Sequence, residues 1–359
     1  MGQTPPLVEN ERTPLASLHV ASDLQMHRGR LTPHVFEDCT IELGHLMHSA
    51  AVYDLGYLTR IRITGKDRVR WLNGMVTNNT RDMAEGSGLY TFVLNAQGRI
   101  QGDGYIFRSP DHYLFETDRL QLPRLLAHLD HFIIMDDVDL QELDAANTTL
   151  GLAGPEAPAI LESLGIDIPE KMTFAQTAIQ GIPVTLVSAY EVLVPRFELW
   201  LASEHAGELW RILTEAGAKP AGFAALNSLR IFEGVPEYGV DITDRALPQE
   251  TNQMRALNFS KGCYLGQEIV ERIRSRATVH RTLKQFDLQG DLPQSGAELH
   301  VEGDDKPIGE ITSASHYALP GFTQTLALGF VRIEVLERKA AITYAGGTAT
   351  PLEGPLTLP

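Results

Sequence analysis

The chain has 359 residues, a hydrophobic fraction of 43% and a formal net charge of −16, the balance of an ordinary globular protein with two or three domains. Its two cysteines, more than two hundred positions apart, exclude a disulfide framework and a zinc finger, and no apolar run is long enough to span a membrane. The acidic surplus disfavours nucleic acid and anionic lipid as direct partners, and the polar first residues favour a cytoplasmic protein.

Residues 1–30 carry three prolines among charged and small polar residues, so we predict a loose N-terminal lead-in there. Residues 31–278 alternate helical and strand-like patterns with hairpins, which favours an α+β architecture over a parallel sheet. In the first half of this region we expect a strand near 60–64, a helix over 66–76, a hairpin of strands 89–94 and 100–107, a strand over 112–117, a helix around 125–132 and a strand near 138–143.

The second half of this region repeats the pattern, with strands expected at 150–153, 184–187 and 197–201 and helices after Pro158 and over 204–216 and 223–233. Two interleaved split αβ subdomains of ferredoxin-like type would accommodate both halves. Residues 279–356 change to short alternating segments with glycine and proline, which predicts a C-terminal β-barrel. Its expected strands are 284–288, 297–301, 308–312, 326–331 and 340–344.

The familiar nucleotide-binding and hydrolase motifs are absent from the sequence. Two histidine pairs, His45 with His48 and His128 with His131, have a spacing that could share a helix face. No cysteine or clear third ligand accompanies them, so we interpret them as surface or partly buried side chains and predict no metal site.

The densest motif is Lys261–Glu268, with the sequence K-G-C-Y-L-G-Q-E. An apolar stripe downstream predicts a helix that starts near Gly266. Cys263 would then lie just before a helix N-terminus and two residues from Lys261, an environment that stabilises a thiolate. The alternative is a small buried residue in a tight loop.

A basic run follows this motif: residues 261–284 contain six basic and two acidic side chains, a local net charge of +4. Such a run is usually a solvated face. Arginines such as Arg272 and Arg274 could instead form a mouth that captures a carboxylate or phosphate in bidentate fashion.

The third feature is the hairpin over 95–104, in which Asp103 lies in a strand between two glycines. A carboxylate at mid-strand is disfavoured by propensity, which indicates close approach of another group. A surface aspartate is the equally good alternative.

These motifs together resemble a known family. Lys261–Glu268 matches the K-G-C-[FY]-x-G-Q-E motif of the YgfZ-like folate-binding proteins, which are relatives of the glycine cleavage system T-protein, an aminomethyltransferase. The segments similar to the T-protein are 53–55, 61–67, 72–78, 95–103, 229–231 and 234–239. In all, the resemblance covers roughly residues 38–345.

The resemblance implies a three-domain ring around a central channel that holds tetrahydrofolate or another reduced folate, with a β-barrel as the C-terminal domain. It also implies a role in the assembly or repair of iron-sulfur clusters. The expected partners are iron-sulfur client enzymes, among them a tRNA-modifying one, or assembly proteins.

Two departures from the T-protein pattern bear on mechanism. The T-protein has two aspartates where this chain has Gly102-Asp103, and its Y-T-G-E segment is missing ahead of strand 197–201. The T-protein has a glutamate that binds the pterin at the position of Phe232 in this chain, and Glu233 follows directly. Part of the catalytic pattern of an aminomethyltransferase is therefore absent, and the sequence leaves open whether the protein is an enzyme.

A folate site needs a carboxylate for the pterin N–H edge, apolar walls for the benzoyl ring and cations for the glutamate tail. Asp103 or Glu233, then Tyr90 with Phe92 or Phe232, and then Arg272 with Arg274 could fill these roles. The matched segments add four further candidate cofactor-binding residues, which are Arg230, Lys261, Tyr264 and Gln267. The candidate catalytic residues are Cys263 and Asp103.

Three functions follow from these residues. The leading one is a tetrahydrofolate-binding protein that supports iron-sulfur clusters, with Cys263 as a thiolate near the folate. The first alternative is a folate-dependent aminomethyltransferase, and the second is an interaction scaffold without folate.

Overall fold

The computed structural model describes residues 12–17, 23–143, 146–276, 279–354 and 356–358. The chain divides into two compact units. Unit 1 comprises residues 1–65, 84–88 and 105–226, and unit 2 comprises residues 66–83, 89–104 and 227–359. The chain therefore passes between the units several times, which interleaves the α+β part of the sequence.

Unit 1 contains a six-stranded sheet with the order β10-β11-β12-β9-β3-β13. Its strands are β3 (Ala51–Asp54), β9 (Asn147–Ala153), β10 (Phe174–Ile179), β11 (Ile182–Ser188), β12 (Arg196–Ala202) and β13 (Lys219–Ala221). The associated helices are α1 (Cys39–His48), α4 (Ala157–Ser163) and α5 (Ala206–Glu215). Apolar residues of α4 and α5 pack with those of β9, β11 and β12 in one core, so these helices cover one face of the sheet.

A five-stranded sheet has the order β5-β6-β7-β4-β8. Its elements are β4 (Leu58–Thr64), β5 (Gly88–Leu94), β6 (Ile100–Arg108), β7 (Tyr113–Asp118) and β8 (Asp139–Glu142), followed along the chain after β7 by α3 (Leu122–His131). Strand β6 enters unit 1 at Tyr105, and from there to Arg108 it pairs antiparallel with β7. Ile61 and Ile63 of β4 are fully buried, as the alternating pattern predicts.

The described part of the N-terminal lead-in belongs to unit 1. It contains the short helix η2 (Leu15–Ser17) and the hairpin of β1 (Asp23–His27) and β2 (Arg30–Val35). Leu15 belongs to the core of the six-stranded sheet, and the Thr13 hydroxyl donates to the buried Asp54 carboxylate at 2.5 Å. Leu15 is buried and Thr13 satisfies a buried acid, so this described part is packed; residues 1–11 and 18–22, where the sequence also predicts a loose lead-in, lie outside the described part.

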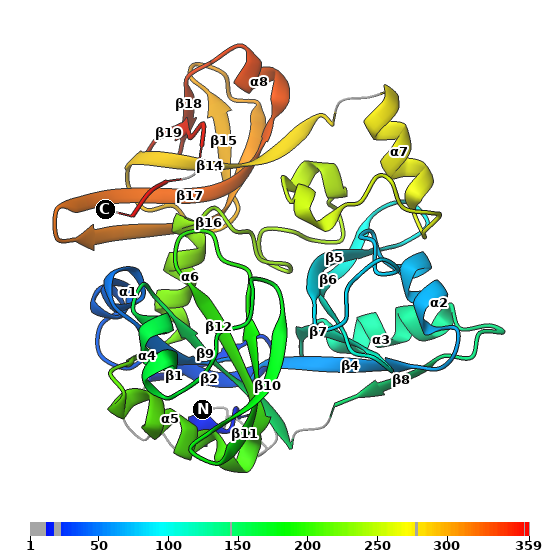
Figure 1. Ribbon diagram of the computed structural model, residues 1–359. Helices are drawn as coiled ribbons and strands as arrows, with labels where there is room; N and C mark the ends of the chain where they lie inside the picture. Colours follow the sequence, from blue (N-terminus) through cyan, green and yellow to red (C-terminus); the bar gives the residue numbers. More distant parts are fainter. Residues whose placement is uncertain (1–11, 18–22, 144–145, 277–278, 355, 359) are drawn as a thin grey trace, which may run out of the picture. The chain divides into compact units, whose positions relative to one another are not determined.

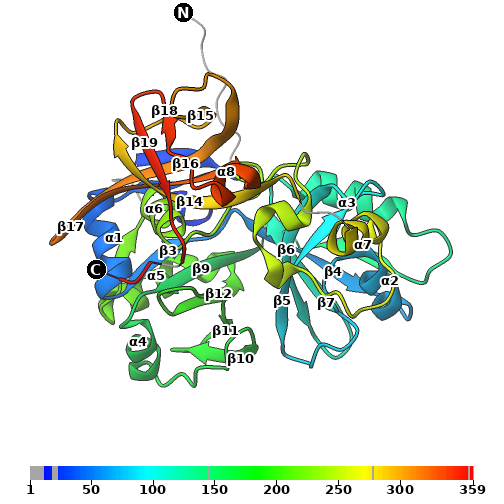
Figure 2. The same cartoon turned by 90° about the horizontal axis from the view of Figure 1, so that it is seen from above.

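Unit 2 contains a closed six-stranded barrel, visible at the top of Figure 1 and from above in Figure 2. Around the barrel the order is β14-β17-β16-β15-β18-β19. Its elements are β14 (Arg281–Gly290), β15 (Ala297–Val301), β16 (Pro307–Leu319), β17 (Phe322–Arg332), α8 (Ile333–Glu337), β18 (Ile342–Tyr344) and β19 (Gly347–Pro351). Closure pairs every strand on both sides, so no exposed edge remains. The predicted α+β class with a C-terminal β-barrel is confirmed.

The other elements of unit 2 surround the candidate site. They are α2 (Arg68–Met75), most of α6 (Phe223–Phe232), the short helices η4 (Pro248–Thr251) and η5 (Met254–Ala256), and α7 (Gln267–Arg276). Helix α7 begins one residue after Gly266, where the sequence predicts it.

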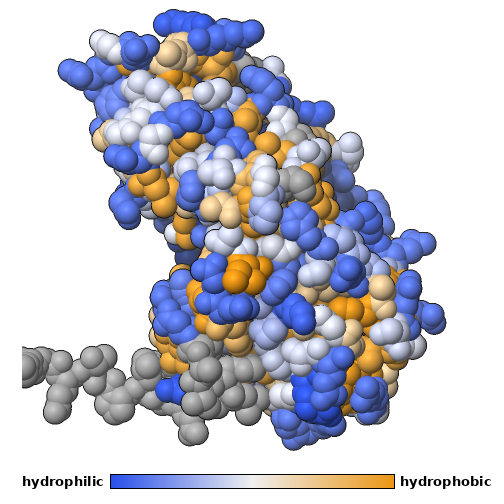
Figure 3. Space-filling view, turned by 90° about the vertical axis from the view of Figure 1, so that its left-hand side faces the viewer, coloured by the Kyte–Doolittle hydropathy of each residue, from blue (hydrophilic) through white to orange (hydrophobic). Residues whose placement is uncertain are grey.

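The surface of the protein is mostly hydrophilic on the face that Figure 3 draws. In the face drawn in Figure 3, hydrophilic groups are interspersed with small apolar spots. In the part of the chain that the structure describes, no helix has the length and apolar character needed to cross a lipid bilayer.

Candidate functional site

The hairpin of β5 and β6 brings Asp103 to a half-buried position in unit 2. Gly98 allows the turn because its φ is +71°, a value that residues with a side chain rarely adopt. On β6, Gly102 and Gly104 are buried whereas Asp103 between them is half-buried. Successive side chains alternate across a strand, so the carboxylate lies on the face opposite to these glycines.

Tyr90 and Arg255 surround this carboxylate with polar groups. The Tyr90 hydroxyl donates to Asp103 Oδ2 at 2.5 Å. The guanidinium carbon of Arg255 lies 4.1 Å from the centre of the Tyr90 ring, in cation–π contact, and Arg255 Nε donates to Gln253 Oε1 at 3.1 Å. A carboxylate, a phenol and a guanidinium from three segments of the chain therefore meet at one place, which we take as the candidate site.

Asn78 joins the segments that carry these groups. Its side-chain amide donates to the carbonyl of Tyr90 at 2.8 Å and to the carbonyl of Arg255 at 2.9 Å. Sequence analysis found neither Asn78 nor Arg255 as a site residue. Asn78 was only the last residue of the segment 72–78 that is similar to the T-protein, and Arg255 lies in a segment without a recognisable pattern.

Lys261, the first residue of the K-G-C motif, is buried under this site. Its ammonium donates to the carbonyls of Asn73 at 2.6 Å, Val76 at 2.6 Å and Asn78 at 2.7 Å. Helix α2 ends at Met75, so two of these carbonyls lie at or beyond the helix end, where intrahelical donors are missing. A cation is also favoured at this end of the helix dipole. Lys261 therefore caps α2 and fixes Asn78.

Burial acts on two ionisable groups of the motif. It lowers the pKa of Lys261 to about 7, with a smaller contribution from the charge of Arg81. The three carbonyl acceptors oppose this shift, because only the protonated ammonium can donate to all three. Burial raises the pKa of Tyr264 to about 12, and its ring centre lies 5.0 Å from the Lys261 ammonium.

The rest of the motif forms a loop that packs against the hairpin that carries Asp103. Gly266 has a φ of +82°, and a Cβ there would lie 2.6 Å from the carbonyl oxygen of Asn95. Gln267 opens α7, and its side-chain oxygen accepts the backbone N–H of Tyr264 at 3.3 Å. Cys263 is exposed on this loop, which excludes the alternative of a small buried residue. Among the described residues, no group of three or more His, Cys, Asp or Glu side chains could hold a metal ion.

Two arginines of the basic run, Arg272 and Arg274, lie on a solvated face of α7. Arg272 pairs with Glu268 at 2.8 Å, one turn earlier on the helix, and the side chain of Arg272 is 58% exposed. Arg274 lies 3.6 Å from Glu271 and stacks 4.5 Å above the ring of Phe259. Whether either arginine contacts a ligand stays a prediction.

Arg230 belongs to a separate buried network between α6 and the barrel. Its guanidinium pairs with Asp241 at 2.6 Å and with Glu237 at 2.9 Å, and it donates to the hydroxyl of Ser313 at 3.0 Å. Asp241 is completely buried and also accepts the hydroxyl of Thr312. The structure therefore gives Arg230 a role in holding α6 against β16, and its contact with a cofactor stays a prediction.

Glu233 is 8% exposed and lies just beyond the end of α6. It lines a hollow of about 350 Å³ together with Gln253, Lys284 and Gln285. Gln253 is the residue that accepts the hydrogen bond from Arg255, so the hollow and the Asp103–Tyr90 pair are linked through one arginine. Phe232, by contrast, packs against the barrel rings of Tyr317 and Phe322.

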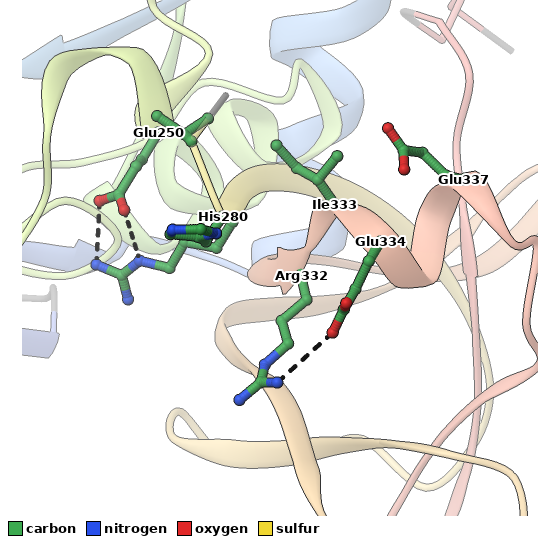
Figure 4. Close-up of a pocket in the computed structure, with 8 residues that line it drawn as sticks. Glu250, His280, Arg332, Ile333, Glu334 and Glu337 are labelled. Atoms are coloured by element: carbon green, nitrogen blue, oxygen red, sulfur yellow. Dashed lines mark hydrogen bonds and ion pairs between the residues drawn. The ribbon is translucent and has the colours of Figure 1, made fainter. Parts of the chain in front are cut away.

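Figure 4 shows a larger hollow of unit 2, about 580 Å³ in volume, at the start of β14 and α8. Four of its polar residues are paired with one another: Glu250 with Arg281 at 3.2 Å, and Arg332 with Glu334 at 3.6 Å. None of the residues that sequence analysis singled out for the site lines it, so we do not place the site there.

The fold and the site define a class of α+β protein that combines a closed barrel with a half-buried aspartate on a β-hairpin. Residues 21–261 match the family model described as the GCVT N-terminal domain, and the chain belongs to this family. The coarser part of the resemblance is thereby confirmed. The narrower assignment to the YgfZ-like proteins stays a prediction.

Known proteins resemble most of the chain. An aminomethyltransferase of Thermus thermophilus is 27% identical over 329 residues, which cover 89% of this chain and 91% of that protein. One of Caldanaerobacter subterraneus is 24% identical over 333 residues, covering 89% and 88%. The crystal structure of the glycine cleavage system aminomethyltransferase T from Bartonella henselae has a TM-score of 0.85 at 20% identity and covers 95% of this chain and 96% of that one, which shows a shared fold.

Proposed function

We propose that this protein binds a reduced folate at the Asp103–Tyr90–Arg255 site and acts as a folate-dependent aminomethyltransferase. The observation that carries the proposal is the half-buried Asp103 carboxylate, which is held by a phenol at 2.5 Å on the hairpin that resembles the T-protein hairpin. The names of the relatives support the same reaction type.

The residues present fit a reduced folate. Asp103 offers an acceptor for the N–H groups that a pterin donates, and the half-buried Lys284 offers a cation for the carboxylates of the tail. The ring of Tyr90, 7% exposed, lies beside the carboxylate, and the fully buried ring of Phe92 packs 5.5 Å from it and supports it from the core.

When bound, the folate supplies the nitrogen that receives the one-carbon unit in such a transfer. In our proposal Asp103 would accept a hydrogen bond from the reacting N–H and would take up its proton as the N–C bond forms and the C–S bond to the carrier breaks, with the carrier thiolate as leaving group. Tyr90 would fix the carboxylate in position. Gly102 stands where the T-protein has a second aspartate, so Asp103 alone performs both the orienting and the proton-accepting role.

The test combines two measurements on the full-length protein. Titration with 5-formyltetrahydrofolate by calorimetry measures binding, and ammonia release from an aminomethyl-loaded lipoylated carrier protein measures transfer. We expect Asp103→Asn to weaken folate binding about tenfold and to slow ammonia release by about 100-fold. The matched control is Asp111→Asn, which makes the same chemical change at an exposed aspartate.

Different failures point to different alternatives. Unchanged folate affinity after alanine substitution of both Asp103 and Glu233 would refute the site. No binding by the unaltered protein would favour the folate-free scaffold. Folate binding without ammonia release would refute the proposed transferase activity and support folate as the ligand.

The second candidate function is the support of iron-sulfur clusters. The observation that favours it is the exposed thiol of Cys263 in the K-G-C motif. The relatives described above are aminomethyltransferases, so we rank this function second. Its test is the activity of an iron-sulfur client enzyme in cells that carry Cys263→Ser. The substitution should lower that activity and leave folate binding intact; equal activity with either residue would exclude a role for the thiol.

A further inference from the structure

Arg255 is held beside the candidate site through its backbone. It lies in η5, and its carbonyl accepts the side-chain amide of Asn78 at 2.9 Å. The next carbonyl along the chain, that of Ala256, accepts the hydroxyl of Thr77 at 2.7 Å. Two successive residues of η5 are therefore tied to two successive residues that follow α2, and this fixes the point from which the Arg255 side chain starts.

The guanidinium of Arg255 is oriented as well as placed. Its Nε donates to Gln253 Oε1 at 3.1 Å, and its guanidinium carbon lies 4.1 Å from the centre of the Tyr90 ring. Arg255 is half-buried, and Tyr90 is 7% exposed. A cation above an aromatic ring is attracted more strongly where both groups are partly desolvated than at an exposed surface.

The ring under this cation differs from others that arginines cover in unit 2. Phe259 and Phe330 each lie under an arginine and carry no hydroxyl. Tyr90, by contrast, donates its hydroxyl to Asp103 Oδ2 at 2.5 Å. The Tyr90 ring therefore has a cation on its face and a carboxylate at its hydroxyl end.

A cation on the face of a phenol acts on the phenol's hydroxyl. It draws electron density from the ring and the oxygen, so the O–H becomes a stronger donor. The bond that a phenol donates to a carboxylate is charge-assisted and is about twice as strong as a neutral one. The guanidinium also balances the negative charge of the half-buried carboxylate. Arg255 can therefore act on Asp103 through the Tyr90 ring.

We propose that Arg255 is a positioning residue of the transferase site, whose charge strengthens the hydrogen bond with which Tyr90 holds the Asp103 carboxylate. This inference rests on the proposed function and adds a residue to it. A carboxylate held in one orientation meets the reacting N–H at the angle that proton transfer needs, whereas a rotating one is turned away part of the time. Loss of the charge should therefore slow transfer more than it weakens folate binding.

Two substitutions of Arg255 separate its charge from its shape. Arg255→Met keeps the apolar stem without the charge, and Arg255→Lys keeps the charge without the planar fork. We expect Arg255→Met to slow ammonia release from the loaded carrier about tenfold, and to change the affinity for 5-formyltetrahydrofolate by less than about threefold. Arg255→Lys should regain a rate within about threefold of the unaltered protein. The matched control is Arg211→Met, the same change at an exposed arginine of unit 1, which should keep both values.

Tyr90→Phe tests whether the charge acts through the hydroxyl. This variant keeps a ring under the guanidinium and removes the donor to Asp103. In its background we expect Arg255→Met to slow ammonia release by less than about twofold, because the link from the charge to the carboxylate is already broken. A full tenfold effect in that background would overturn the proposal, since Arg255 would then act by another route.

A measurement that needs neither folate nor carrier separates this inference from the proposed function. Tyrosine labelled with carbon-13 at Cζ gives an NMR signal for each ring of the full-length protein, and Tyr90→Phe identifies the signal of Tyr90. We expect Arg255→Met to move this signal and Arg255→Lys to return it toward its original position. Arg211→Met should leave it in place.

An unmoved Tyr90 signal in Arg255→Met would overturn the proposal, and so would a folded Arg255→Lys variant that transfers as slowly as Arg255→Met. If the unaltered protein releases no ammonia, the transferase proposal fails, and the Tyr90 signal still decides whether Arg255 acts on the phenol. Arg255→Gln, whose amide can still donate to Gln253, takes the place of Arg255→Met if that variant loses its thermal transition.

Discussion

Lys261 uses all three of its N–H donors on backbone carbonyls, which distinguishes it from a lysine that binds a ligand. The K-G-C motif placed it among the candidate cofactor residues. In the structure its ammonium fixes the end of α2 and, through Asn78, the positions of Tyr90 and Arg255. Its effect on the candidate site is therefore one of positioning.

Replacing Lys261 by methionine keeps the apolar stem and removes the donors. Three buried carbonyls lose their partner, so we expect the free energy of unfolding to fall by about 3 kcal/mol. Urea denaturation followed by circular dichroism measures the change. Lys219→Met, at an exposed lysine of β13, is the control and should alter stability by less than about 0.5 kcal/mol. An equal response of both variants would contradict the capping role.

The buried Asp54 should make the stability of the protein depend on pH. Burial raises the pKa of Asp54 to about 6, although hydrogen bonds from Thr13 and from the N–H of Gly56 pull it down. Because the folded-state pKa lies above the usual 3.8, the native protein binds this proton more tightly than the unfolded chain does. The contribution of Asp54 to stability therefore rises as the pH falls from about 7 to about 4.

Asp54→Asn removes this titration and keeps an acceptor for Gly56. We expect the variant to gain up to about 3 kcal/mol over the unaltered protein at pH 7.5, with most of that gain gone at pH 4.5. The difference between the two proteins in urea denaturation at each pH isolates Asp54 from other titrating groups. A difference that does not change with pH would contradict the shifted pKa.

At the scale of the element, the loop between η5 and α7 depends on one of its two glycines. Gly266 has φ +82° and lies against the carbonyl of Asn95, whereas a Cβ at Gly262 would meet nothing within 4 Å. The two glycines share a motif but face different constraints.

Gly266→Ala should therefore destabilise the protein by about 2 kcal/mol, through left-handed backbone strain and collision with the hairpin turn. Gly262→Ala is the matched control and should change stability by less than about 0.5 kcal/mol. Thermal unfolding of both variants measures the contrast, and the reverse order would show that the motif loop is held differently.

Elements with a strong local period were predictable from sequence. Alternation gave β4, the stripe after Gly266 gave α7, and the turn residues of 95–98 gave the β5–β6 hairpin. The β1–β2 hairpin was missed because its turn uses Arg28 at φ +50°, which a sequence pattern does not reveal. At the site, Asp103 was found as a polar residue in an apolar strand. The pairing of Arg255 with Tyr90 was not, because it joins residues 165 positions apart through tertiary packing.

At the scale of the whole molecule, the interleaving of the two units along the chain determines which fragments can fold. Residues 66–83 and 89–104 belong to unit 2, although the segments that flank them belong to unit 1. Their partners come from late in the chain: the hydroxyl of Thr77 donates to the carbonyl of Ala256 at 2.7 Å, and the N–H of Asn258 donates to the carbonyl of Thr77 at 3.1 Å.

A fragment of residues 1–226 therefore cannot complete either segment. We expect it to lack a cooperative thermal transition and to elute as an expanded or aggregated species in gel filtration. Co-expression with residues 227–359 supplies the missing partners and should restore a compact species. A fragment that melts cooperatively on its own would show that unit 1 folds without the late segments.

The buried ammonium of Lys261 also sets the order of events during synthesis. The bond to the Asn73 carbonyl joins residues 188 positions apart, so the end of α2 has to wait for more than half of the chain. Contacts of such long range form after the entropy of closing the loop has been overcome, and a ribosome needs on the order of ten seconds or more to reach Lys261 after Asn73. During that interval Asn78 lacks its anchor, and the candidate site can be completed only after residue 261 of the 359 has been added.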